Sequence, residues 1–191
     1  PVARDVPATL ALRLARFDPA LFAPEWPGAI DADLVWHGHL GEQGLEGELV
    51  VERLEGVLRE RALRGDGTLV LRAGELATAT LEMAAGASTL QVLRDAPGAP
   101  LRLEFESPDL ADLMPDWHGR VRASAQIDRD WRIQADLGDV VSPRFALAEA
   151  RAQAAFGADA QSPVGLNATL RGLVVADQRL AAQLIELLTQ R

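Results

Sequence analysis

A repeated template is the feature that most constrains how this chain can fold. The template is a set of five residues at fixed spacing, which stands at Asp18, Ala20, Pro24, Trp26 and Gly28 and again, ninety-one residues later, at Asp109, Ala111, Pro115, Trp117 and Gly119. Aligned without gaps, residues 8–30 share eight of twenty-three positions with residues 99–121, where unrelated segments would share about two. A repeat indicates an array whose units bury their apolar faces against one another. Such an array favours a surface or a conduit over a single catalytic pocket.

Between the copies, apolar and polar residues alternate with period two. Leu101, Leu103 and Phe105 alternate with Arg102 and Glu104, and the same pattern recurs along most of the chain. Period two is typical of antiparallel strands with one dry and one wet face. Turn residues separate the runs. We place turns at Gly65-Asp66-Gly67, Ala73-Gly74, Ala85-Gly86 and Pro97-Gly98. The pattern predicts an all-β chain of about ten to twelve short strands in a meander of hairpins.

The template itself predicts a short corner helix that feeds the next strand. In the first copy Asp18 caps the helix and Pro24 ends it. In the second copy Ser107 offers the same capping chemistry two residues before Asp109, so we expect a helix longer by about two residues. The template tryptophans would plug the end of the sheet. The predicted structural corners consist of Asp18, Pro24, Trp26, Gly28, Asp109, Pro115, Trp117 and Gly119.

A third, incomplete copy follows the second. Residues 166–170 match residues 10–14 in phase, and a C-terminal helix is expected from Asp177. We therefore treat residues 1–191 as one repeat-built segment with units at about 8–98, 99–164 and 165–191. The chain opens at Pro1 without a charged leader and ends about where the next Pro-x-Trp-x-Gly element is due. We interpret it as an interior piece of a longer repeating protein.

Composition argues against several classes of function. The net charge is −9, and acidic residues accompany each arginine cluster, which disfavours nucleic-acid binding. Zero cysteines exclude disulfides and thiolate metal sites. With five Phe, four Trp and no Tyr, any core must rest on Leu, Val and Ala. No apolar run reaches the length of about twenty residues that a membrane-spanning helix needs.

The chemistry-bearing residues fit no catalytic pattern. His37 and His39 form a His-x-His pair, but no third ligand stands at a recognisable spacing, so we read them as solvent-facing strand residues. Carboxylate pairs such as Asp109 and Asp112 are explained by helix starts and turns. Nucleophile elbows, phosphate-binding glycine loops and His-Glu-x-x-His are all missing. We expect no enzyme, no cofactor and no metal site.

Four stretches carry degenerate strand-and-turn phrases: residues 17–28 (FDPALFAPEWPG), 54–59 (LEGVLR), 63–67 (LRGDG) and 107–119 (SPDLADLMPDWHG). Together they resemble the TamB family, the inner-membrane subunit of the bacterial translocation and assembly module, related more broadly to AsmA-like bridge proteins. The resemblance runs over most of the chain. It implies an elongated antiparallel sheet curled into an open, taco-like trough. It also implies a periplasmic location, with the parent protein anchored in the inner membrane of a Gram-negative bacterium.

In this family the trough is linked to phospholipid movement between the membranes and to outer-membrane protein assembly with the barrel subunit TamA. The resemblance therefore implies that inward apolar residues contact phospholipid acyl chains, with no catalytic residue. The predicted groove consists of Leu10, Leu12, Leu14, Leu69, Leu71, Leu81, Met83, Leu90, Val92, Leu101, Leu103, Phe105, Val121, Ile127, Ile133, Leu137, Phe145, Leu147, Leu166 and Leu170.

Several alternatives remain open from the sequence. Period two is shared by an open trough and a closed sandwich, because both need one apolar face per strand. Instead of carrying lipid, the sheet could hold unfolded outer-membrane protein strands by β-augmentation. It could also be a segment of a β-solenoid adhesin with a filled interior. Because an exposed apolar floor is a liability in solution, we expect the isolated chain to dimerise or to take up detergent.

Overall fold

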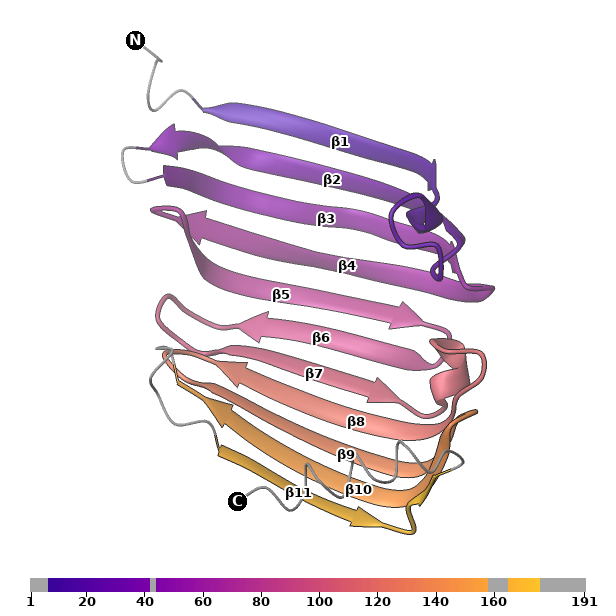
Figure 1. Ribbon diagram of the computed structural model, residues 1–191. Coiled ribbons are helices and arrows are strands. Elements are labelled where there is room, and N and C mark those ends of the chain that lie inside the picture. The colour runs from indigo at the N-terminus through magenta and orange to yellow at the C-terminus, as the bar shows by residue number, and fades with distance from the viewer. Residues whose placement is uncertain (1–6, 42–43, 158–164, 176–191) are drawn as a thin grey trace.

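The protein is built almost entirely from β-strands (Figure 1). The computed structural model describes residues 7–41, 44–157 and 165–175. The strands are β1 (Ala8–Phe17), β2 (Gly28–Gly41), β3 (Gly44–Leu58), β4 (Arg61–Arg72), β5 (Glu75–Ala85), β6 (Ser88–Arg94), β7 (Leu101–Ser107), β8 (His118–Ile127), β9 (Trp131–Val141), β10 (Phe145–Phe156), β11 (Gly165–Arg171) and β12 (Val174–Val175). Two single 3-10 turns, η1 (Pro19–Leu21) and η2 (Leu110–Asp112), follow β1 and β7.

The strands form one open antiparallel sheet. Strands β1 to β11 lie side by side in chain order, and β12 pairs with β10. Among the described residues β1 pairs only with β2, and β11 pairs only with β10, so the two edges do not close on each other. The predicted antiparallel meander is confirmed, and the described strands do not form the closed sandwich that period two had left possible.

Individual strands are longer than predicted, and one predicted turn is wrong. Strand β3 has 15 residues, a length of about 50 Å. Gly65-Asp66-Gly67 lies inside β4, beside a register shift between Val51 and Leu54 of β3. A Cβ added at Gly67 would lie 2.4 Å from the carbonyl oxygen of Thr80. These glycines therefore allow a close approach of strands next to a bulge instead of reversing the chain.

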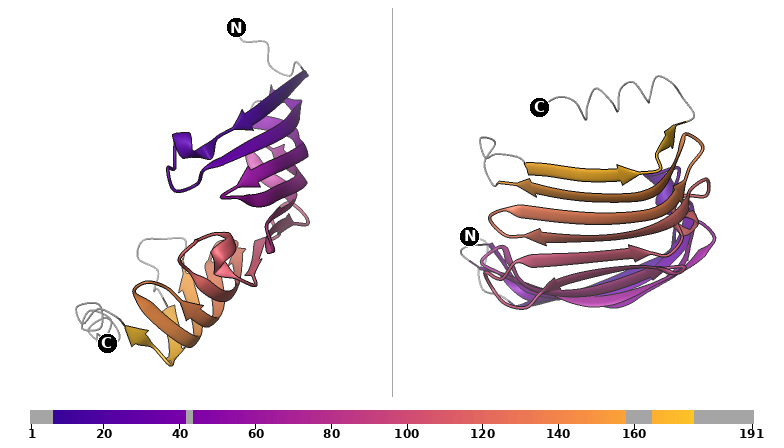
Figure 2. Two further views of the ribbon diagram at one scale, coloured as in Figure 1. Left: turned by 90° about the vertical axis from the view of Figure 1, so that its right-hand side faces the viewer. Right: turned by 90° about the horizontal axis from the view of Figure 1, so that it is seen from below.

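The sheet is twisted and curled. Figure 2 shows the strand direction rotating steadily from β1 to β11, and the view from below shows the strands bowed along their length. Connections from odd to even strands, which include η1 and η2, gather at one end of the sheet (Figure 1). Both 3-10 turns lie on the inner side of the bow. We call the end of the sheet at which the odd-to-even connections gather the corner end.

The predicted corner helices are single 3-10 turns. Each has three residues, and Asp18 and Asp109 cap the two turns by accepting hydrogen bonds from the amides of Ala20 and Ala111. The longer second helix is wrong, because the Ser107 hydroxyl is already engaged: it accepts a hydrogen bond from Ser88 at 2.8 Å and donates to the Asp109 carbonyl at 3.0 Å. The predicted C-terminal helix lies outside the described residues.

The only cluster of fully buried apolar side chains in the described part of the chain lies at the corner end. Leu110, Val140, Leu147 and Ala150 form it, each at most 6% exposed. Partly buried side chains of Trp117 and neighbouring residues pack around them. Elsewhere the sheet has no second layer among the described residues, so most apolar side chains stay half-exposed.

Candidate functional site

Register places one non-polar residue of each strand from β1 to β11 in a single row across the sheet. Directly opposed residues in an antiparallel pair share a face, so the row can be followed from strand to strand. It runs through Leu12, Leu34, Val51, Gly67, Leu81, Val92, Leu103, Ala125, Ile133, Ala154 and Leu166. No charged or polar residue interrupts this row.

A second row runs beside the first, toward the corner end. It consists of Leu14, Ala32, Leu54, Gly65, Met83, Leu90, Phe105, Ala123, Ala135, Ala152 and Ala168. From β8 onward the second row is lined by alanine alone. Along the second row the side chains are therefore small over the last four strands, whereas the first row keeps Ile133 and Leu166 there.

The residues predicted to line a groove share this face. Most lie in these two rows. Others lie two residues further along the same strands and so share the face, as Leu69 does with Gly67 and Ile127 with Ala125. Phe145 and Leu147 instead pack in and against the buried cluster near η2. Sequence reasoning missed Leu34, Val51 and other members of the rows on β2 and β3, although their alternation was visible in the sequence. We call the whole surface the apolar face.

The opposite face carries ladders of complementary charge. Asp33 lies between Arg13 and Arg53, with nitrogen–oxygen distances of 2.6 and 2.9 Å. The hydrogen bond from Arg13, together with the positive charge of both arginines, holds the pKa of Asp33 below its ordinary value of 3.8. Further along, Glu106 pairs with Arg122 at 2.7 Å. These ion pairs link neighbouring strands through long polar side chains on the face that contacts water.

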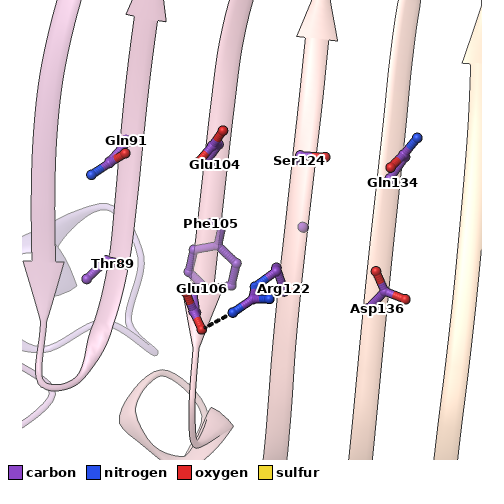
Figure 3. A pocket seen from close by; sticks show the side chains of 10 residues that line it. Thr89, Gln91, Glu104, Phe105, Glu106, Arg122, Ser124, Gln134 and Asp136 are labelled. Carbon is purple, nitrogen blue, oxygen red and sulfur yellow. Dashed lines mark hydrogen bonds and ion pairs between the residues drawn. The ribbon is translucent and has the colours of Figure 1, made fainter.

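A depression of about 350 Å³ opens on this polar face between β6 and β9. Figure 3 shows its side chains, with Glu106 and Arg122 joined across neighbouring strands and Gln134 and Asp136 on the far wall. The lining mixes both signs of charge with amides and hydroxyls. It was not foreseen from the sequence, because most of its residues are simply the polar half of the alternation.

The two corners reproduce each other bond for bond. In both, the amide three residues after the capping aspartate bonds back to that aspartate's carbonyl oxygen, at 3.3 and 3.1 Å. Both then form a turn with proline in its second position, closed by Trp26 N–H to the Ala23 carbonyl and by Trp117 N–H to the Met114 carbonyl. The repeated template therefore encodes the local hydrogen bonds of a corner.

Each template tryptophan closes its corner in a different way. Trp117 meets Phe145 edge to face at 5.4 Å and packs against the buried cluster. Trp26 lies under the guanidinium of Arg59, whose central carbon is 5.1 Å from the centre of the indole ring.

The second corner also holds its capping carboxylate. The hydrogen bond from the amide of Ala111, with His118 nearby, holds the pKa of Asp109 below its ordinary value. Gly119 has φ +110°, a conformation that suits glycine.

The histidines lie apart from any metal-binding arrangement. His37 is hydrogen-bonded to Thr9 at 3.2 Å, and His39 lies 3.9 Å from Glu46. Within the described ranges no three His, Asp or Glu side chains gather as metal ligands. In the same residues no helix is long and apolar enough to cross a membrane.

These features define a class: an amphipathic, open antiparallel sheet with one continuous apolar face and capped corners at one end. The family model that matches is TamB, N-terminal domain, over residues 4–184. The chain therefore belongs to the TamB family, a family of bacterial envelope proteins. No curated protein and no solved structure matches the chain.

Proposed function

We propose that this chain is a non-catalytic periplasmic segment whose apolar face carries phospholipid acyl chains between the inner and outer membranes. Through the parent protein it would also support outer-membrane protein assembly with the barrel subunit TamA. Membership of the TamB family supports a role in envelope protein assembly and lipid transport. The single observation that carries the finer proposal is the apolar row that crosses eleven strands without a polar residue.

Physical chemistry favours a lipid occupant for such a surface. An uncovered apolar face of this extent is unusual on a protein in water and marks a binding surface. Acyl chains need only a continuous apolar floor, since they offer no groups for directional bonding. The alanines of the second row from β8 onward take up less volume above the sheet than aromatic side chains would.

Placing one charge in the row tests the proposal. Leu103 lies mid-row, between Val92 and Ala125. Leu103→Arg should remove most of the phospholipid that co-purifies with the full-length protein, because a cation on the apolar floor must be desolvated against the acyl chains. The amount of lipid per protein, measured by mass spectrometry, is the readout.

Glu104→Arg is the matched control. It adds the same side chain one residue along β7, on the polar face. The control should retain its lipid. Equal loss in both variants, or full retention in Leu103→Arg, would show that lipid does not occupy the apolar face.

A second candidate function is capture of unfolded outer-membrane strands at a free sheet edge. The observation that favours it is exposure at the edges: Leu10 is 66% exposed on β1 and Leu166 is 65% exposed on β11. Edge strands present unpaired backbone groups that can template another strand. The partner that would pair with these backbone groups is an unfolded strand of a nascent outer-membrane protein.

The two functions separate by variant. Ala11→Lys places a charge on the edge strand β1 but on its polar face, one residue away from the row member Leu12, and should reduce capture of an unfolded barrel strand while lipid retention persists. Leu103→Arg should do the reverse. The solenoid alternative called for a filled interior, and the described sheet offers instead an open face with antiparallel pairing throughout.

A further inference from the structure

The cation Arg94 lies on the apolar face. Arg94 ends β6 (Ser88–Arg94), and its Cα is paired with Ala79. Ala79 is paired in turn with Leu69, which faces Leu49 of β3. By register Arg94 therefore belongs to the same face as these apolar residues, on the side away from the corner end.

Arg94 has no partner for its charge in the described part of the chain. Its Nε is buried without a hydrogen bond, and no ion pair or hydrogen bond of its guanidinium is found among the described residues. The adjacent acid, Asp95, instead pairs with Arg102. A guanidinium has five N–H donors, and arginine is seldom placed against apolar surface without an acceptor for them.

The position of Arg94 gives the apolar face a direction. At the other end of β6, Ser88 is 2% exposed and bonds Ser107 beside the corner. Leu90 and Val92 lie between Ser88 and Arg94 on the same face. The seven residues of β6 span about 20 Å, comparable with the half-thickness of about 15 Å of a bilayer's hydrocarbon core.

We propose that Arg94 binds the phosphate of a phospholipid whose acyl chains lie over the Leu90–Val92 stretch toward the corner end. The inference rests on the proposed function, because it assigns the head group of the same lipid. Arginine suits this role since its planar fork bonds two phosphate oxygens at once. The sheet would then bind the lipid head group at the end away from the corners, in addition to binding the acyl chains on its apolar face.

The test compares two lipids with the same acyl chains in the 191-residue chain. A solvatochromic dye bound to the apolar face is displaced with short-chain phosphatidylglycerol or with the matching diacylglycerol, which lacks the phosphate. The native chain should prefer phosphatidylglycerol by about tenfold. Arg94→Gln should abolish the preference and leave the affinity for diacylglycerol unchanged, and Arg94→Lys should restore part of it.

Arg132→Gln is the matched control. Arg132 also lies near the end of the sheet away from the corner, on the polar face of β9. It should keep the tenfold preference. A preference that survives in Arg94→Gln would overturn the assignment, as would dye displacement by inorganic phosphate alone. If neither lipid displaces the dye, the proposed function itself fails and this inference fails with it.

Discussion

At the scale of single residues, the aspartates of the template do the most identifiable work. Asp18 Oδ1 accepts hydrogen bonds from the amides of Ala20 and Gly28, both at 3.0 Å. One carboxylate oxygen therefore fixes the start of η1 and the start of β2. The sequence predicted this cap from residue type alone. It misassigned the second cap because Ser107 looks equally suitable until its buried partner Ser88 is known.

Replacing Asp18 should measure the cap. Asp18→Ala removes both acceptor contacts and should lower the free energy of unfolding by about 1–2 kcal/mol. Asp18→Asn keeps a side-chain oxygen and should cost clearly less. Urea unfolding followed by tryptophan fluorescence provides the measurement. Equal losses in the two variants would show that the hydrogen bonds are not what the residue contributes.

Asp33 predicts a pH dependence. Its pKa is held below the ordinary value by Arg13 and Arg53, so its contribution to stability is present above that value and is lost as the pH falls. Asp33→Asn should therefore be less stable than the native chain at about pH 6, and the difference should close toward about pH 3. The contribution should shrink in high salt, because Arg13 is largely exposed. A difference independent of pH contradicts this account.

At the scale of elements, the hairpin turn between β3 and β4 connects the two corners through Arg59. Arg59 and Glu60 form a two-residue hairpin turn with φ of +52° and +65°, a conformation that Asn-Gly adopts far more readily. Arg59 lies over Trp26 of the first corner and donates a hydrogen bond to the Leu113 carbonyl of the second. In a flat sheet β4 and β7 would stand about 14 Å apart, so this bridge depends on the curl of the sheet.

The bridge can be removed while the turn is relaxed. Arg59→Asn with Glu60→Gly should keep the hairpin folded but broaden and lengthen the distance between spin labels at Leu21 and Asp116. Both label sites are exposed, and the absence of cysteine allows unique labelling. Ala73→Asn makes the same type of turn change at Ala73-Gly74, at the other end of β4, and should leave the distance unchanged. Identical distributions in all three chains would show that Arg59 does not hold the corners.

Elements were predictable where local pattern decides them. Alternation located β7 to β9, and Ala73-Gly74 marked a true turn. Strand length was not predictable, because the bulge in β3 opposite Gly65 and Gly67 lets β3 and β4 continue where glycine suggested a reversal. The extra length comes from close strand contact, which only the neighbouring strands reveal.

At the scale of the whole molecule, the openness of the sheet is the property that the sequence left undecided. The same alternation would serve two packed sheets, and only pairing beyond nearest neighbours distinguishes them. The structure shows β1 and β11 as separate edges, and among the described residues no second sheet covers the apolar rows. Which residues share the face was predictable from period two, whereas the continuity of the row through Gly67 required the register.

Site-specific photocrosslinking in the cell envelope tests the central claim most directly. A benzophenone side chain is introduced at Leu103 or Ile133, on the apolar face, and at Arg102 or Gln134, their polar-face neighbours. The account predicts phospholipid adducts from the first pair and none from the second. Equal capture from both faces, or capture from the polar face alone, would contradict a lipid-carrying apolar face.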